Sequence, residues 1–250
     1  MNLTIAWLYP DLMSTYGDRG NVITLQKRCE WRGIEAEVKK ISVDSPIEDL
    51  ESTDLIFMGG AQDTQQEIVN RDLFAGRGEE IKKLVNKNVP GLFICGAYQF
   101  MGNYYKTAEG KILKGLKLFD LYTVSSKLGE KRLIGNVIIK SKVKSQKSKV
   151  FVGFENHGGR TYLKDKSQAF ALVEKGYGNN SEDATEGIIF KNAIGSYLHG
   201  PLLPKNPEIA DWLISLALEV KYKKKIELKP LNDELELKAR EEIIKKIIKH

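Results

Sequence analysis

The sequence predicts an α/β fold of three layers, with helices on both faces of a mostly parallel sheet and additional β-hairpins in the second half. In the first half, short apolar runs alternate with stretches of helical spacing, which is the pattern of a parallel sheet covered by helices. After about Leu116 the runs are shorter and turn residues separate them, which favours hairpins. A chain of 250 residues can bury a substantial core within one large domain.

In the first half, apolar runs predict strands at residues 3–9, 36–41, 54–58 and 92–94. Helical spacing predicts helices over residues 22–32, 66–86 and 98–105. Gly33 stands just past the first of these, where glycine commonly ends a helix. Gly76 and Gly78 are expected to break the second. The resulting alternation of strand and helix indicates a parallel sheet.

In the second half, strands are expected wherever short apolar runs stand between turn residues, at 119–124, 133–140, 150–155, 169–174, 187–190 and 193–198. Helical spacing returns over residues 207–220. Residues 230–250 have the pattern of a charged amphipathic helix, which we expect to be an accessory surface helix. The chain is therefore divided into a domain of residues 1–222 and a charged C-terminal extension of residues 223–250.

The formal net charge of +6 raises the question of a nucleic-acid partner. Much of the excess comes from lysines within residues 140–149 and 221–225. The first group alternates with small or apolar residues, and the second follows a helix C-terminus, where cations suit the helix dipole. No aromatic side chains interleave with the first group, and no nucleic-acid-binding motif occurs. Solvated surfaces explain both groups, and no nucleic-acid partner is expected.

The composition indicates a cytoplasmic protein. No apolar run approaches the length of a membrane span, and the start of the chain lacks the features of a cleavable signal. Two cysteines, Cys29 and Cys95, provide no disulfide framework and fit a reducing compartment. A metal site is not expected, because neither cysteine has a ligand partner at close spacing and the three histidines are far apart.

Cys95 is the most informative residue of the chain, because it ends the apolar run GLFIC and precedes Gly96 and Ala97. A sharp turn from strand to helix exposes the residue at the corner, as in the nucleophile elbow of hydrolases. The positive end of the following helix favours a thiolate. A buried structural cysteine is the competing interpretation, and the rest of the chain favours a nucleophile.

A thiolate nucleophile needs a base, and histidine is the usual one. His199 in SYLHGP and His157 in FENHGG both stand at predicted strand ends, whereas His250 is the last residue and is excluded. The nucleophile also needs backbone N–H groups directed at an oxyanion. The glycine pair before Ala61 allows a close backbone approach, so Gly60 and Gly96 are the candidate donors.

Three segments carry a family resemblance. MGGAQD, FICGAYQFMG and SYLHGP, in this order and spacing, resemble the oxyanion strand, nucleophile elbow and histidine segment of class I glutamine amidotransferases, closest to the cobyric-acid-synthase-like branch. Within that branch, YGDRGN, KRLIGNVII and FENHGGRTYL look like the glutaminase subunit of lipid II isoglutaminyl synthase, an enzyme that amidates D-glutamate of the peptidoglycan stem peptide. The resemblance covers roughly the first 220 residues and leaves the C-terminal extension outside.

The resemblance implies a class I amidotransferase fold and a glutaminase reaction. Cys95 would attack the side-chain carboxamide of L-glutamine, release ammonia and form a glutamyl thioester that water hydrolyses. His199 would transfer the protons as general base and acid. Gly60 and Gly96 would form the oxyanion hole.

The resemblance also implies two residues that bind or support the substrate. Gln99, four residues after the nucleophile, would support the pocket. Arg132 in KRLIG would bind the glutamine through its α-carboxylate, which a guanidinium fork suits.

The sequence departs from most class I enzymes at two positions. Ala97 stands where they have glycine in the turn, and Pro201 stands where they have a glutamate that orients the histidine. The cobyric-acid-like branch generally lacks that glutamate, so the second departure agrees with the placement. Another residue must then orient His199, and Asp18, Glu155 and Asn156 are the candidates.

The chain is expected to act with a partner. Amide formation from a carboxylate usually needs ATP, and no G-x-x-x-x-G-K-[ST] loop occurs here. The chain should therefore hold no cofactor, and ATP and Mg²⁺ are expected on a Mur-ligase-like amidoligase subunit of the MurT type that receives the ammonia.

Three other functions remain compatible with these motifs. The chain could be the glutaminase component of another cobyrinate- or cobyric-acid-type amidotransferase, with the same chemistry and a different acceptor. It could be a binding subunit that lost catalysis, although the set Cys95, His199 and Gly60 is intact. It could also be a cysteine peptidase or esterase on a related fold.

Overall fold

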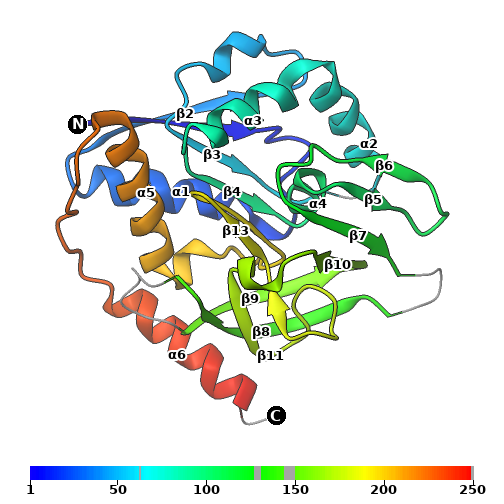
Figure 1. Ribbon diagram of the computed structural model, residues 1–250. Coiled ribbons are helices and arrows are strands. Elements are labelled where there is room, and N and C mark those ends of the chain that lie inside the picture. The colour runs from blue at the N-terminus through cyan, green and yellow to red at the C-terminus, as the bar shows by residue number, and fades with distance from the viewer. Residues whose placement is uncertain (62, 127–130, 144–149, 249–250) are drawn as a thin grey trace.

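The computed structural model describes residues 1–61, 63–126, 131–143 and 150–248. Within the range 63–126, side chains are described from residue 65 onward. His250 and the lysines within 144–149 lie outside the described residues. Within these residues, three sheets form the β-structure, and helices flank the largest of them (Figure 1). No helix in the described part of the chain combines the length and apolarity needed to cross a membrane.

The main sheet has six strands in the order β13-β14-β4-β3-β1-β2. All neighbouring strands are parallel except the edge strand β13, which is antiparallel to β14. The strand bounds are β1 Asn2–Leu8, β2 Glu35–Ile41, β3 Leu55–Met58, β4 Gly91–Ile94, β13 Ile188–Phe190 and β14 Ala193–Ser196. Every residue of β3, β4 and β14 is buried, as expected for central strands covered on both faces.

Helices cover both faces of this sheet. The β1–β2 connection contains α1 (Arg19–Glu30), and the β3–β4 connection contains α2 (Asp63–Asp72) and α3 (Gly78–Asn86). The two connections run in opposite directions across the sheet, and right-handed crossovers then place their helices on opposite faces. Helix α5 (Pro207–Tyr222) packs on α1 (Figure 1). The predicted three-layer α/β fold is thus confirmed.

The helix expected over residues 66–86 is interrupted as the glycines indicate. A π-helical segment, η3 (Leu73–Arg77), separates α2 from α3, and Gly76 within it has φ of 137°. Glycine alone adopts such a φ without steric cost.

The second half forms two further four-stranded sheets, ordered β10-β7-β5-β6 and β12-β11-β8-β9. Their bounds are β5 Tyr104–Lys106, β6 Ile112–Lys114, β7 Leu121–Ser125, β8 Leu133–Ser141, β9 Val150–His157, β10 Gly159–Leu163, β11 Ala171–Lys175 and β12 Thr185–Glu186. The sequence did not predict β5, β6, β10 or β12. The predicted helix over 98–105 is wrong in its second part: α4 (Gly96–Met101) ends where Gly102 becomes extended, and Tyr105 then pairs in the sheet.

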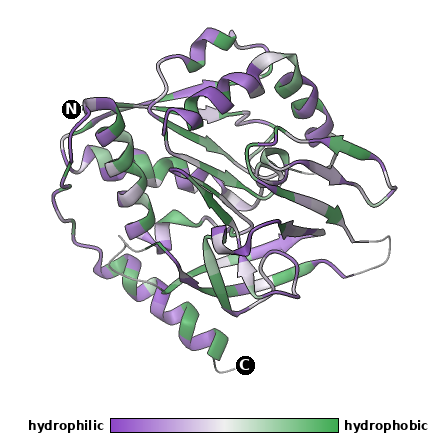
Figure 2. Cartoon of the chain, viewed as in Figure 1, coloured by the Kyte–Doolittle hydropathy of each residue, from purple (hydrophilic) through white to green (hydrophobic). Residues whose placement is uncertain are grey.

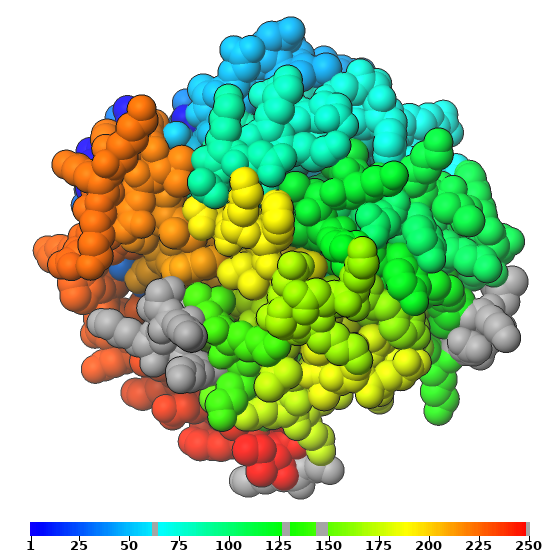
Figure 3. Space-filling model, viewed as in Figure 1, coloured from blue at the N-terminus to red at the C-terminus, as the bar shows by residue number. Residues whose placement is uncertain are grey.

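The C-terminal extension forms α6 (Glu234–Ile248), which packs on β8 and β9. Ile247 packs in one small cluster with Ile138 and Val152, and Arg240 makes two hydrogen bonds to Glu208 of α5 at 2.9 and 3.0 Å. Apolar and polar residues alternate along this helix (Figure 2). Together α5, the connecting segment and α6 run down one flank of the molecule (Figure 3).

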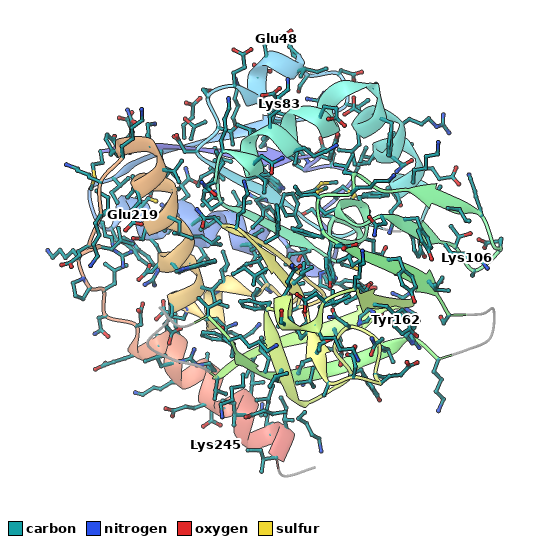
Figure 4. The ribbon with its side chains drawn as sticks, in the orientation of Figure 1. Glu48, Lys83, Lys106, Tyr162, Glu219 and Lys245 are labelled. Carbon is teal, nitrogen blue, oxygen red and sulfur yellow. The ribbon has the colours of Figure 1, made fainter. Side chains whose placement is uncertain are left out.

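A buried arginine ties the extension to the domain. Arg28 of α1 is 1% exposed and contacts Asp211 of α5 and Asp233, just before α6, at 2.6 Å each. Burial of a guanidinium is favourable only when its charge and donors are matched, and the two carboxylates supply both. Figure 4 labels Glu219 of α5 and Lys245 of α6; Glu219 accepts from Ile226 N at 3.2 Å, whereas Lys245 is exposed.

Replacing Arg28 with methionine is expected to lower the free energy of unfolding by about 3 kcal/mol, because Asp233 loses its arginine partner while Asp211 loses one and retains Arg32. Urea unfolding followed by circular dichroism measures the change. Lys27→Met is the matched control, since Lys27 makes only an exposed pair with Glu30. A loss no greater than that of the control would contradict the prediction.

Candidate active site

Cys95 stands at a strained corner between β4 and α4. Its φ and ψ are 52° and −105°, a combination that non-glycine residues adopt only at a cost of about 1–3 kcal/mol. Two hydrogen bonds hold this corner: Cys95 N donates to Ser196 O at 2.8 Å, and Gln99 N donates to Cys95 O at 3.0 Å. Ala97 is buried within the turn, so a methyl group is accommodated there. The geometry is that of a nucleophile elbow.

His199 follows the end of β14, the strand beside β4. Its backbone forms an antiparallel bridge with Phe154 of β9, in which His199 N donates to Phe154 O at 2.7 Å and Phe154 N donates to His199 O at 3.1 Å. The bridge fixes the histidine where the main sheet meets the β8–β9 sheet. His199 itself is fully buried.

Asp18 orients the imidazole. Its Oδ1 lies 3.0 Å from His199 Nδ1, and because a carboxylate accepts, Nδ1 carries the hydrogen. Within the described residues Nε2 has no hydrogen-bond partner, so this nitrogen is the one available to a reacting group. The ring of Tyr16 packs edge-on against the imidazole with centroids 5.1 Å apart. Cys95, His199 and Asp18 thus form a line of nucleophile, base and orienting carboxylate.

The surroundings of His199 favour its cationic form. Burial by itself lowers the pKa of His199, but the charge of Asp18, the nearby Cys95 and the hydrogen bond to Asp18 raise it to about 10. The imidazolium is therefore kept through neutral pH and is lost only as the pH rises through that value. A histidine held in this state can donate a proton to a leaving group.

The backbone amide of Gly60 is already used. Gly60 N donates to Asp18 Oδ2 at 2.8 Å, which corrects the expectation that this amide is an oxyanion donor. Its neighbour Ala61 lines the cavity at Cys95. The Ala61 nitrogen lies 3.3 Å from the position that a Cβ on Gly96 would take. Gly96 opens α4, where first-turn N–H groups have no partner within the helix, so Ala61 and Gly96 are the amides placed for an oxyanion.

Gly60 is required for a steric reason instead. A Cβ there would lie 2.7 Å from His199 Cε1, 2.8 Å from Thr15 Oγ1 and 3.1 Å from Cys95 Cβ. These distances are shorter than van der Waals contact, so a side chain would separate the nucleophile from its base.

A cavity of about 250 Å³ opens at Cys95. Its lining residues are Thr15, Tyr16, Ala61, Gln66, Cys95, Gln99, Tyr105, Ser125, Arg132, Asn156, His157, Gly158 and Gly159. The cavity therefore brings Cys95 and Gln99 together with Arg132, as the sequence analysis expects. Thr15, Tyr16, Ala61 and Gln66 are lining residues that the sequence analysis missed.

Arg132 is held in place by one residue of the adjacent strand. Its Nε donates to Asn156 Oδ1 at 2.9 Å and its Nη2 donates to Asn156 O at 2.8 Å. The guanidinium is thereby fixed at the cavity, where it can bind an anionic group such as a carboxylate.

Gln99 is buried beneath the cavity. Its Nε2 donates to the hydroxyl of Tyr197 at 3.1 Å, and within the described residues its Oε1 has no hydrogen-bond partner. A buried, unpartnered acceptor beside the nucleophile can receive an N–H of a ligand.

Two of the three candidates for orienting His199 lie against other groups. Glu155 accepts from the amides of Tyr177 and Gly178 at 2.8 and 2.9 Å, and Asn156 holds Arg132. The orienting role expected of Glu155 and Asn156 is therefore corrected, because only Asp18 among the three contacts His199 in the described structure.

His157 is not placed as the base. Its Nδ1 is 2.8 Å from Gly159 O, and its ring stacks on Tyr197 with centroids 3.6 Å apart. Burial lowers the pKa of His157, although the nearby Glu155 opposes this shift. The imidazole is thus a neutral part of the cavity wall.

Sequence comparison places the chain beside known glutamine amidotransferases. Residues 4–207 match the model of the CobB/CobQ-like glutamine amidotransferase domain. The chain is 40% identical to the lipid II isoglutaminyl synthase (glutamine-hydrolyzing) subunit GatD of Staphylococcus aureus, over 97% of this chain and 95% of that protein. It is 38% identical to GatD of Streptococcus pneumoniae, over 96% and 90%. The resemblance thus extends into the C-terminal extension, which corrects the expectation that it ends near residue 220.

Solved structures share the fold. The PurLQS structure from Thermotoga maritima matches with a TM-score of 0.59 and 14% identity, over 90% of this chain and 100% of that chain. The glutaminase domain of Trypanosoma brucei CTPS, with bound acivicin, matches with a TM-score of 0.55 and 14% identity, over 91% and 96%.

Replacing Asp18 with asparagine is expected to lower the pKa of His199 by about 1–3 units, because the opposite charge that offsets burial is removed. Nuclear magnetic resonance titration of the histidine side chains measures the change. Asp11→Asn is the matched control, because Asp11 is exposed and near in sequence. The prediction fails if the His199 titration is the same in both variants.

Proposed function

The chain belongs to the CobB/CobQ-like glutamine amidotransferase family, and we propose that it is the glutamine-hydrolysing subunit of a lipid II isoglutaminyl synthase. The observation that carries the reaction is the grouping of Cys95, His199 and Asp18: a Cβ on Gly60 would touch both Cys95 and His199, Asp18 holds the imidazole, and the cavity opens at Cys95. The near full-length match to two GatD subunits supports the choice of pathway.

The first half of the reaction forms a thioester. The sulfur of Cys95 attacks the side-chain carboxamide carbon of L-glutamine, and the amides of Gly96 and Ala61 stabilise the resulting oxyanion. His199 donates its Nε2 proton to the nitrogen, the C–N bond breaks, and ammonia leaves. A γ-glutamyl thioester remains on Cys95, and the carboxylate of Asp18 keeps the imidazole in its orientation throughout.

The second half returns the enzyme to its starting state. The now neutral Nε2 of His199 accepts a proton from water, whose oxygen attacks the thioester carbon. The C–S bond breaks, the thiolate of Cys95 re-forms beside the imidazolium, and glutamate leaves. Arg132, which Asn156 holds in place, binds the α-carboxylate of glutamine and thereby positions the side-chain carboxamide at Cys95.

The ammonia is used on a partner. The family relation supports a Mur-ligase-like amidoligase subunit of the MurT type that binds ATP and Mg²⁺ and activates the D-glutamate carboxylate of lipid II. Ammonia that escapes into water is protonated and is then no nucleophile, so the two subunits should form a complex with a closed route between their sites. Both subunits would then work in the cytoplasm, where ATP and the lipid II precursor are accessible.

The alternative acceptors are less well supported. The probable cobyric acid synthase of Methanosphaera stadtmanae matches at 30% identity over 64% of this chain and only 33% of its own length. The GatD subunits match along almost their whole length.

Replacing Cys95 with alanine is expected to abolish ammonia release from L-glutamine, because the thioester cannot form. A coupled glutamate dehydrogenase assay on the full chain measures the release. Cys29→Ala is the matched control, because Cys29 is buried away from the cavity and should leave the activity unchanged. Undiminished release by the Cys95 variant would refute the glutaminase mechanism.

The full chain with ATP, Mg²⁺, glutamine and lipid II is expected to leave lipid II unamidated until a Mur-ligase-like partner is added. The reason is that the sequence contains no P-loop to bind ATP. Mass spectrometry of the lipid II stem peptide detects the amide through its mass difference. Amidation of lipid II by this chain alone would contradict the proposal that the partner carries out the ATP-dependent step. Transfer of the ammonia to a cobyrinate instead would favour the alternative acceptor.

A further inference from the structure

Gln66 of α2 is a buried amide whose head group lies against the nucleophile elbow. The side chain is 4% exposed and lines the cavity at Cys95. A Cβ on Gly96 would lie 3.0 Å from Gln66 Nε2 and 3.3 Å from the Ala61 nitrogen. Gln66 Nε2 and the Ala61 nitrogen therefore both lie beside Gly96, whose amide is one of the two oxyanion donors.

The orientation of this amide follows from its hydrogen bond. Nε2 of Gln66 donates to Ala61 O at 3.0 Å. A backbone carbonyl only accepts, so the nitrogen and not the oxygen of the side chain must face it. Within the described residues Oε1 has no hydrogen-bond partner, which leaves the bond to Ala61 as the one that fixes the head group.

Ala61 is then held from both sides. On one side, Gly60 N donates to Asp18 Oδ2 at 2.8 Å. On the other side, Ala61 O accepts from Gln66. The peptide unit between these two bonds carries the Ala61 N–H, and its own carbonyl, Gly60 O, accepts from Thr15 N at 3.2 Å. Asp18, Thr15 and Gln66 therefore set its direction together. Preorganised donors stabilise an oxyanion because they need no reorganisation during the reaction.

We propose that Gln66 is a positioning residue of the oxyanion hole, which holds the Ala61 amide towards the developing oxyanion. The proposal rests on the glutaminase function proposed above and adds a residue to it. Gln66 acts through Ala61, so its loss should slow the chemical step and leave glutamine binding largely intact.

The test compares two variants of the full chain. Q66E keeps the shape of the side chain but places a carboxylate, which cannot donate, against the carbonyl of Ala61. Q66M keeps the volume and removes both polar atoms. We expect kcat for glutamine hydrolysis to fall about 10–100-fold in each, with KM changed by less than about threefold. The neighbouring Gln65→Glu is the matched control, since Gln65 does not line the cavity.

A second measurement separates positioning from general damage to the site. Alkylation of Cys95 by iodoacetamide, followed by mass spectrometry of its peptide, requires the thiolate but forms no oxyanion. Its rate should be the same in the wild type and in both Gln66 variants. A fall in kcat with unchanged alkylation supports the proposal.

The other outcomes overturn it. An unchanged kcat would show that Ala61 needs no support from Gln66, and a rise in KM alone would show a binding role. A parallel loss of alkylation and turnover in both variants would show that Gln66 maintains the pocket as a whole. Absence of ammonia release from the wild-type chain would instead refute the proposed function, so the two failures are distinguishable.

Discussion

The carboxylate of Asp18 is the point on which the site depends, because its two oxygens bind different segments of the chain. Oδ1 meets His199 Nδ1 and Oδ2 accepts from Gly60 N. One fully buried charge therefore joins the loop after β1, the loop after β3 and the end of β14. A buried carboxylate is stable only when its hydrogen bonds are made, so the fold that buries Asp18 also fixes the base and the backbone of the oxyanion site.

The order of the main sheet explains why these segments meet. Strands β14, β4, β3 and β1 are consecutive and parallel, so their carboxyl ends lie along one edge, where ligands bind in open α/β sheets. The two smaller sheets supply the facing wall with Arg132 and Asn156. The bridge between Phe154 and His199 joins the two parts, and the substrate cavity lies between the nucleophile and this wall.

The sequence predicted the fold class and most strands because they depend on local apolar patterns, and it singled out Cys95 and His199 because glycines and strand ends mark them. It left Asp18, Glu155 and Asn156 unranked, because the choice depends on which carboxylate the tertiary fold brings to His199. It wrongly assigned the Gly60 amide as an oxyanion donor. That amide bonds to Asp18, which lies 42 positions away in the sequence, so no local pattern could reveal the bond. Gln66 had no signal, since nothing local distinguishes it from Gln65 beside it.

The role of the C-terminal extension also depends on tertiary contacts that its local sequence does not reveal. As a sequence it is only a charged amphipathic helix, yet Arg240 binds Glu208 and the segment before α6 supplies Asp233 to the buried Arg28. Because α6 also packs on β8 and β9, it supports the two strands at whose ends Arg132 and Asn156 lie. The match to the GatD subunits spans 97% and 96% of this chain, so the sequence similarity includes part of the segment that makes these contacts.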